Sequence, residues 1–148
     1  MSERPAIVIN GVSGRMGRML VKVVSESGLA RLAGGLERPG HDWIGQDLGA
    51  AMGGPALGVI VHDDPVRALR GVQAVIDFTT PSASAALAPF AADLGVAHVI
   101  GTTGFSEDEL TPIAQAARHG VIVRAGNMSL GVNLLVALTR RVAAALDA

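Results

Sequence analysis

Three glycines near the start of the chain, Gly11, Gly14 and Gly17, are spaced by threes within the stretch VINGVSGRMGRML at 8–20. They lie where an apolar strand gives way to a helical pattern. A helix N-terminus offers unpaired amides and a positive dipole end, and glycines let a pyrophosphate approach the backbone. The stretch therefore predicts a dinucleotide phosphate site. Its G-x-x-G-x-x-G spacing varies from the usual G-x-G-x-x-G, so a strand–helix turn that merely needs glycines is the alternative.

A carboxylate and a guanidinium follow the second predicted strand. Glu37 lies twenty residues after Gly17, where a dinucleotide site needs an acceptor for a ribose hydroxyl. Arg38 is adjacent and offers paired hydrogen bonds to a 2′-phosphate. The pair predicts binding of both NADH and NADPH, and a solvated charge pair in a loop is the alternative.

Two further polar stretches follow the fifth and sixth predicted strands. VIGTTGF at 99–105 places two hydroxyls, those of Thr102 and Thr103, between two glycines, so both side chains can face a ligand. RAGNMSLGVN at 124–133 contains Asn127, which could bond a carboxamide or a backbone group. Ligands of doubly wound sheets lie beyond the carboxyl ends of the strands, which favours a site here over a plain polar turn.

Short apolar runs alternate with helical patterns along the chain. The runs predict six strands, at 6–10, 30–37, 58–63, 74–78, 97–101 and 120–126. Helices are predicted at 15–27, 82–94 and 107–118, with a loop and a possible helical turn over 38–57. This alternation predicts an α/β fold of the Rossmann type: a doubly wound parallel sheet with helices on both faces and strand order 3-2-1-4-5-6.

Local signals mark the ends of these helices. Gly28 is the expected stop of the first, and Thr80 or Ser82 is the expected cap of the second. Ser106 with Glu109 forms a capping box for the third helix. Pro112 leaves open whether that third helix is split or restarted.

The last segment differs from the rest of the chain. Over 131–148 an apolar stripe runs along one helical face, and further apolar residues lie on other faces. A helix that is apolar most of the way round normally has neighbours on more than one side. The sequence predicts a dinucleotide-binding domain at 1–126, and a helix in the remaining segment at 127–148 that needs apolar neighbours from elsewhere.

Composition excludes several classes of protein. The net charge is −1, which gives no basic surplus for nucleic acid or an anionic membrane. The chain has no cysteine and no apolar run near the roughly 20 residues of a membrane span. We expect a cytoplasmic protein with a small-molecule substrate and no metal. His98 is expected to be a buried structural histidine.

These stretches together resemble the 4-hydroxy-tetrahydrodipicolinate reductase family, also called dihydrodipicolinate reductase. The resemblance covers the whole chain and is carried by GVSGRMGR (11–18), LER (36–38), DFTTP (77–81), GTTGF (101–105) and NMSLGVN (127–133). It implies NAD(P)H-dependent reduction of dihydrodipicolinate (4-hydroxy-tetrahydrodipicolinate) to tetrahydrodipicolinate, in lysine and diaminopimelate biosynthesis. This chain would supply the cofactor-binding part of that oxidoreductase, which the family assembles as a homotetramer. Residues 127–148 would then be the hinge and the first helix of the family's substrate and tetramerisation domain.

The resemblance also implies roles for individual residues. Glu37 would bind the adenosine ribose and Arg38 the 2′-phosphate, while Thr103 and Gly104 would also border the substrate. The pyrophosphate would be held by backbone amides of Gly11, Val12, Ser13, Gly14, Arg15 and Met16. The nicotinamide would be bordered by Gly101, Thr102, Thr103, Ala125, Gly126, Asn127 and Met128. The family usually has an aromatic residue where this chain has Met128.

The chain departs from the family in one respect. The family's second domain carries a paired-histidine motif, with a lysine three residues later, that binds the substrate and donates the proton. This sequence has no adjacent histidines, and its one lysine, Lys22, lies on the first predicted helix. We therefore expect no catalytic residue within these 148 residues.

Two rival functions share part of the pattern. A free-standing dinucleotide-binding regulatory module would have the glycine turn and Glu37 but no reason to keep GTTGF at 101–105 facing the nicotinamide. Another Rossmann reductase, such as a homoserine or sugar dehydrogenase, would not be expected to contain NMSLGVN at 127–133. Fold alone does not decide among them.

Overall fold

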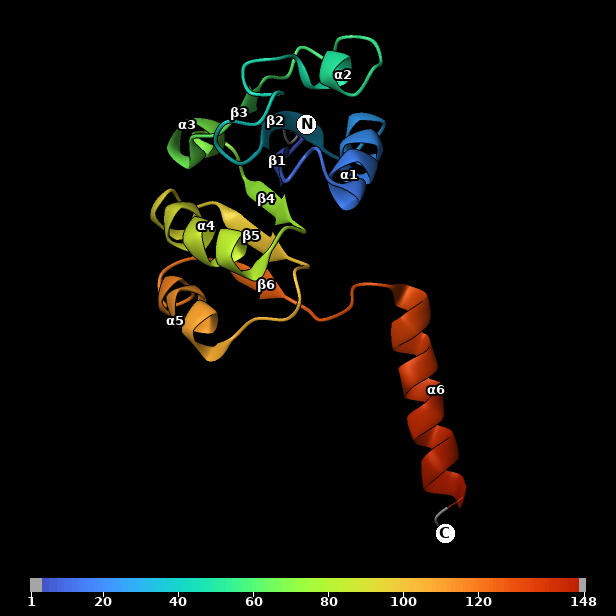
Figure 1. Cartoon of the computed structure of the whole chain (residues 1–148). Helices are drawn as coiled ribbons and strands as arrows, with labels where there is room; N and C mark the ends of the chain where they lie inside the picture. The colour runs from blue at the N-terminus through green and yellow to red at the C-terminus, as the bar shows by residue number, and fades with distance from the viewer. Residues whose placement is uncertain (1–3, 147–148) are drawn as a thin grey trace.

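The computed structural model describes residues 4–146, and its central feature is a sheet of six parallel strands (Figure 1). The strand order is β3-β2-β1-β4-β5-β6, which confirms the predicted doubly wound topology. The strands are β1 (Ala6–Asn10), β2 (Arg31–Leu36), β3 (Val61–His62), β4 (Ala74–Asp77), β5 (Ala97–Ile100) and β6 (Ile122–Arg124). The chain reverses its direction across the sheet between β1 and β4, so a crevice is expected beyond the carboxyl ends of those two strands.

Helices cover both faces of the sheet. They are α1 (Arg15–Ser25), α2 (Leu48–Ala51), α3 (Pro65–Leu69), α4 (Pro81–Asp93), α5 (Glu107–Ala116) and α6 (Leu130–Leu146). Successive strand residues point to opposite faces, so Ile9 of β1 packs with α1 and α2 while Val8 packs with α3 and α4. A third apolar cluster joins α4 and α5 to Ile100 of β5.

Capping side chains fix where several helices begin. Thr80 caps α4, and Ser106 forms the predicted capping box of α5 with Glu109. Asp64 caps α3, a short helix that the sequence analysis did not predict although Pro65 occupies its first position. Asp47 likewise caps α2 by accepting from the amides of Gly49 and Ala50.

Several predicted boundaries were inexact, and the structure answers the question left open at Pro112. The helix α1 ends at Ser25 rather than at Gly28, which does not have the left-handed backbone of a glycine stop. Pro112 does not split α5, because the helix continues across it with the loss of one backbone hydrogen bond. The strand predicted over 58–63 pairs with β2 only at Val61 and His62.

The helix α6 stands apart from the rest of the molecule. Figure 1 shows it projecting away from the sheet after an extended connection, and all of its residues from Leu130 to Leu146 are exposed. Positions 147 and 148 of the predicted final segment lie outside the described residues. Over the part of the chain that the structure describes, no helix combines the length and hydropathy that a membrane span needs.

Candidate functional site

The glycine turn lies between β1 and α1, and its glycines are required by close backbone contacts. Gly11 has a φ of +74°, and a Cβ on it would lie 2.5 Å from the Thr79 methyl group. A Cβ on Gly17 would overlap the carbonyl oxygen of Gly11 and lie 2.8 Å from Val12 Cα. The helix α1 therefore packs directly on the turn, as a backbone-lined anion site requires.

Most amides of the turn already have partners inside the protein. The N–H groups of Gly11 and Val12 both donate to the carbonyl of Leu36, at 2.9 and 3.3 Å. The Gly14 N–H donates to the Gly11 carbonyl at 3.1 Å, and Gly14 is the N-cap of α1 without any side chain to cap it. The amides that open the helix, at Arg15 and Met16, therefore have no partner from within α1 and face outward from its N-terminus.

Glu37 lies directly beside this turn. Its carboxylate accepts from the backbone N–H of Ser13 at 3.1 Å and from the N–H of Arg38 at 3.0 Å. Partial burial by itself would raise the pKa of Glu37, but the hydrogen bonds from Arg38 and Ser13 and the nearby His41 outweigh it and lower that pKa. Glu37 is thus held ionised at the end of β2, where the sequence placed it.

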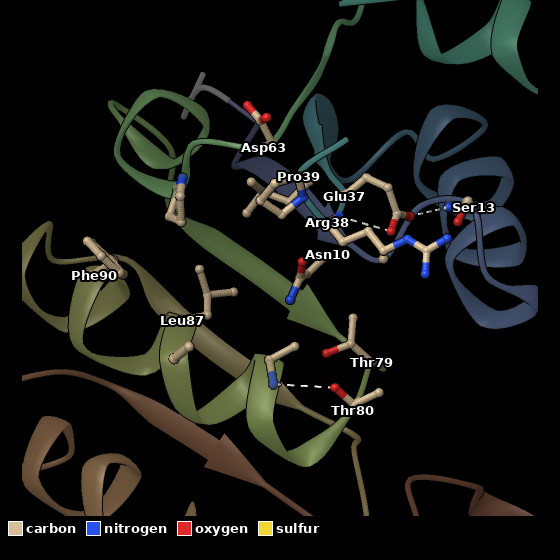
Figure 2. Close-up of a pocket in the computed structure, with 15 residues that line it drawn as sticks. Asn10, Ser13, Glu37, Arg38, Pro39, Asp63, Thr79, Thr80, Leu87 and Phe90 are labelled. Carbon is tan, nitrogen blue, oxygen red and sulfur yellow. Dashed lines mark hydrogen bonds between the residues drawn. The ribbon is translucent and has the colours of Figure 1, made fainter. Parts of the chain in front are cut away.

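A cavity of about 560 Å³ opens between the glycine turn, the end of β2 and the start of α4 (Figure 2). Figure 2 shows the Arg38 side chain reaching from the end of β2 towards Ser13. The cavity is lined by Asn10, Gly11, Ser13, Leu36, Glu37, Arg38, Pro39, Asp63, Pro65, Thr79, Thr80, Ala83, Ala86, Leu87 and Phe90. The glycine turn, a carboxylate and an apolar wall therefore surround one space, and these kinds of group fit the phosphate, ribose and base of a nucleotide.

The loop after β5 contains the predicted GTTGF residues. Gly101 is needed there, because a Cβ would overlap the ring of Phe78, and Gly104 has a φ of +84°. Thr103 is exposed, but Thr102 is buried and its hydroxyl is used inside the protein. The expectation that both threonine side chains face a ligand is therefore wrong for Thr102, which offers only its backbone.

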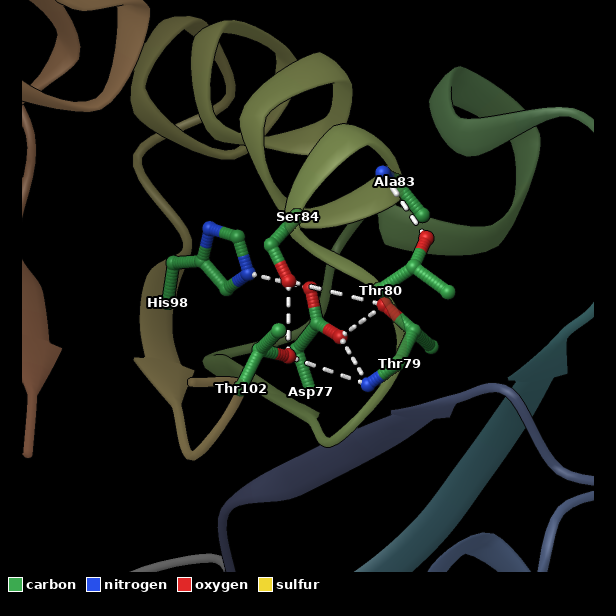
Figure 3. Close-up of polar contacts among 7 residues, drawn as sticks. All are labelled: Asp77, Thr79, Thr80, Ala83, Ser84, His98 and Thr102. Carbon is green, nitrogen blue, oxygen red and sulfur yellow. Dashed lines mark hydrogen bonds and ion pairs between the residues drawn. The ribbon is translucent and has the colours of Figure 1, made fainter. Parts of the chain in front are cut away.

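A buried polar network lies beneath this loop (Figure 3). His98 Nε2 is 3.0 Å from Asp77 Oδ2, and the other carboxylate oxygen accepts from the hydroxyl of Thr79 at 2.6 Å. The Ser84 hydroxyl donates to Thr102 Oγ1, which also accepts from the Thr79 N–H at 3.0 Å. The network joins β4, β5 and α4, and it holds the loops after β4 and β5 together.

Asp77 is the charged centre of that network. Its burial would raise the pKa, but hydrogen bonds from His98 and Thr79 together with the charge of His98 bring the pKa below its ordinary value. His98 is fully buried, which confirms the prediction of a structural histidine. Its Nδ1 is the one buried side-chain nitrogen or oxygen within residues 4–146 that has no hydrogen-bond partner.

The stretch after β6 leads to α6. Ala125 donates its N–H to the Ile100 carbonyl at 3.3 Å, which ties the start of this stretch to β5. The side-chain oxygen of Asn127 accepts from the Ser129 N–H at 2.7 Å, so it bonds a backbone group in this structure. Gly126 and Met128 are exposed. These residues lie at the same edge of the sheet as the glycine turn, although they do not line the cavity.

Several cavity residues were missed by the sequence analysis. Thr79 and Thr80 lie in the loop after β4, where the strand order reverses, and the DFTTP motif carried that signal. Asp63 follows β3 in the same way. The contribution of Phe90 had no sequence signal, because it depends on how α4 is rotated on the sheet. No group of three acidic, histidine or cysteine side chains in the described part of the chain could hold a metal ion.

Curated relatives match almost the whole chain. The family described as "Dihydrodipicolinate reductase, N-terminus" matches residues 5–128. A 4-hydroxy-tetrahydrodipicolinate reductase of Ruegeria pomeroyi is 62% identical over 147 residues, which is 99% of this chain and 55% of the relative. One of Dinoroseobacter shibae is 63% identical over 148 residues, again 55% of the relative. The chain thus spans about half the length of the curated relatives it matches.

Solved structures agree with this assignment. A dipicolinate-bound dihydrodipicolinate reductase from Paenisporosarcina sp. TG-14 superposes with a TM-score of 0.69 at 26% identity, covering 89% of this chain and 51% of that one. A myo-inositol 2-dehydrogenase from Lactobacillus plantarum superposes with a TM-score of 0.62 at 12% identity over 83% of this chain and 36% of that one, which shows the fold alone. With the matched family, the identities above 60% and this fold, the chain belongs to the 4-hydroxy-tetrahydrodipicolinate (dihydrodipicolinate) reductase family and corresponds to its N-terminal part.

Proposed function

We propose that this chain binds NADH or NADPH in the crevice beyond β1, β2 and β4, as the cofactor-binding part of a reductase. The complete enzyme would reduce 4-hydroxy-tetrahydrodipicolinate to tetrahydrodipicolinate in lysine and diaminopimelate biosynthesis. The observation that carries the proposal is the single cavity in which the glycine turn, Glu37 and Arg38 meet. Its residues fit a dinucleotide, since Gly11 and Gly17 let α1 begin directly against the turn and Gly14 leaves the helix N-terminus without a capping side chain where a phosphate would approach.

The adenosine half of the cofactor would occupy that cavity. The uncapped start of α1, at Arg15 and Met16, would face the pyrophosphate together with the turn from Gly11 to Gly14. The ionised carboxylate of Glu37 would accept from the ribose hydroxyls. Arg38 would pair with the 2′-phosphate of NADPH, and the apolar wall of the cavity would contact the adenine ring.

The nicotinamide would extend from the cavity to the loops after β5 and β6. Gly101, Thr102 and Thr103 would border the ring on one side, and the residues from Ala125 to Met128 on the other. When bound, the dihydronicotinamide supplies the hydride that reduces the substrate. This chain's part is to fix the ring's position, through loops that the Asp77 network holds together.

The substrate is a cyclic dicarboxylate, and Thr103 with Gly104 would border it. Thr103 is exposed and Gly104 has an open face, so both are accessible from the crevice side. The cytoplasmic location and the homotetrameric assembly that the resemblance implies stay predictions.

Paired mutations of Glu37 and Arg38 test the proposal. Glu37→Ala should weaken NADH more than NADPH, because NADPH keeps the Arg38 contact, and Arg38→Ala should do the reverse. Each loss should be about ten- to a hundredfold, the effect of one charge-assisted contact. Calorimetric titration of all three proteins with both cofactors measures it. Absence of binding by the unmutated chain would refute the function, whereas equal effects on both cofactors would refute only the two assigned roles.

A further inference from the structure

The peptide units that precede α1 are held by side chains from outside the turn. The Ser13 N–H donates to the Glu37 carboxylate at 3.1 Å, and the Ser13 carbonyl accepts from Arg18 Nε at 2.9 Å. Because Gly11 and Gly14 flank this segment, its backbone would otherwise be free to reorient. The two side chains thus fix the orientation of consecutive peptide planes at the start of the helix.

Arg18 is itself supported by an aromatic ring. Its guanidinium carbon lies 4.8 Å from the centroid of the Trp43 ring, a cation–π contact. Trp43 packs against the apolar cluster under α1, and its backbone N–H donates to His41 Nδ1 at 3.2 Å. The ring of His41 meets Trp43 edge-on at 5.6 Å between centroids. Trp43 is therefore a fixed platform on the loop that follows Arg38.

We propose that Arg18 is a positioning residue for the nucleotide, which acts by locking the Ser13 carbonyl against the Trp43 platform. This inference rests on the proposed function. Ordering a free backbone residue costs about 1–2 kcal/mol, so a turn that is ordered beforehand binds its ligand more tightly. Arg18 also connects the turn that would bind the pyrophosphate to the loop whose first residue, Glu37, would bind the ribose.

Calorimetry with ADP-ribose measures the effect on the adenosine half alone. Arg18→Ala should weaken ADP-ribose binding about 5- to 30-fold, because it removes a charged hydrogen bond and a cation–π contact. Arg18→Lys should regain only part of the affinity, since an ammonium cannot donate along the ring as the planar guanidinium does. Lys22→Ala is the matched control, as Lys22 is exposed one turn further along α1, and it should bind as the unmutated chain does.

The platform gives a second readout. Trp43→Ala should weaken ADP-ribose to a similar degree as Arg18→Ala, whereas Trp43→Phe keeps an aromatic face and should restore most of the affinity. Trp43 is the one tryptophan in the sequence, so its fluorescence reports on Arg18 directly. Saturating ADP-ribose should change that emission in the unmutated chain and in Lys22→Ala but not in Arg18→Ala.

The outcomes distinguish a failure of this inference from a failure of the proposed function. If the unmutated chain binds ADP-ribose and Arg18→Ala binds it within about twofold, the positioning role is overturned while the function stands. An emission change that survives in Arg18→Ala also overturns it. If the unmutated chain does not bind ADP-ribose, the function and this inference are refuted together.

Discussion

The two ends of the crevice are built differently. The adenosine end is defined by Gly11–Met16, Glu37 and Arg38, and one cavity is lined by Gly11, Ser13, Glu37 and Arg38 of this set. Its turn donates hydrogen bonds to Leu36 and Glu37 and accepts one from Arg18. The nicotinamide end, defined by 101–104 and 125–128, lines no such cavity and is exposed at Thr103, Gly126 and Met128. The first end therefore forms a cavity from these residues alone. The second end is held from below by the Asp77 network, but its loops are open to solvent.

Under the proposed function, this difference follows from what each end would bind. Holding an adenosine diphosphate needs backbone amides, a carboxylate and an apolar wall, all of which one α/β unit supplies at its strand ends. Reducing a dicarboxylate also needs cationic groups and a proton donor around the ring. In this chain residues 101–104 and 125–128 offer hydroxyl and amide groups, and the guanidinium of neighbouring Arg124 lies over the Phe105 ring. The helix α6 leads away from this end (Figure 1).

The largest expected effect is the loss of turnover at the nicotinamide end. A polypeptide of residues 1–148 alone should bind cofactor but reduce the substrate at least about 100-fold more slowly than a full-length relative, since a missing general acid alone costs 10²–10⁴-fold. An absorbance assay with a full-length relative as positive control measures this. Turnover within about tenfold of the control would show that the catalytic residues have been misplaced.

The second-largest expected effect is a loss of stability when the buried carboxylate of Asp77 is removed. Asp77→Ala should lower the free energy of unfolding by about 2–4 kcal/mol, because His98 and Thr79 would lose their buried partner. Asp93→Asn, at an exposed contact with His119, is the matched control and should change it little. Urea unfolding measures both, and equal losses would contradict the role of the network.

The pH dependence of the stabilisation by Asp77 has a definite sign. The pKa of Asp77 in the folded state lies below its ordinary value of 3.8, so its stabilising effect is present above that value. It is lost as the pH falls through the folded-state pKa. Between about pH 7 and about pH 3, the free energy of unfolding should therefore decline less steeply for Asp77→Asn than for the unmutated chain. Parallel declines would contradict this assignment.

A change at the glycine turn should damage the adenosine end specifically. Gly17→Ala would place a methyl group against Gly11 and Val12 and should cost about 1–3 kcal/mol of stability, the usual cost of overpacking. It should also weaken ADP-ribose more than tenfold by displacing the turn. Gly28→Ala is the control, because a Cβ there meets nothing within 4 Å. Thermal unfolding measures the stability and calorimetry the affinity of both variants. Equal effects of Gly17→Ala and Gly28→Ala would contradict the role of the turn.

The smallest effect should come from the capping of α5 beside the nicotinamide end. Ser106→Ala removes the hydroxyl that accepts from the Glu109 N–H, and loss of an N-cap costs about 1 kcal/mol. ADP-ribose affinity should stay unchanged, because Ser106 is remote from the cavity lining. A weaker affinity in this variant would mean that the two ends are coupled.

The sequence sufficed to predict the sheet, its strand order and the positions of the glycine turn and of Glu37 at the strand ends. Buried parallel strands are continuous apolar runs, and Glu37 lies at a fixed interval from the glycine turn, so both have local signals. The helix α3 also had one, in the pair Asp64–Pro65, but five residues are too few to show a helical period. Several predicted strands are longer than the observed ones, because hydrogen-bond pairing with a neighbouring strand, rather than composition, decides where a strand ends.

The parts that could not be predicted depend on tertiary contacts. No pattern shows that the Thr102 hydroxyl turns inward to Ser84 while Thr103 stays exposed, since the two residues are identical in type. The contact of Arg18 with Trp43 likewise joins residues of a helix and an irregular loop. Such contacts follow from the packing of α1 on the sheet, which sequence spacing does not encode.

The pairing of β1 with β4 has a consequence for how the chain folds. Gln73 donates from its backbone to the Ala6 carbonyl and accepts from the Ala6 N–H through its side chain, across 67 positions. Closing so long a loop costs entropy before its contacts are made, and such non-local topologies fold slowly. Since the crevice lies at this junction, it can form only when that closure is complete. A nucleotide that binds there would therefore stabilise the folded chain, because it binds only after these two distant segments have come into contact.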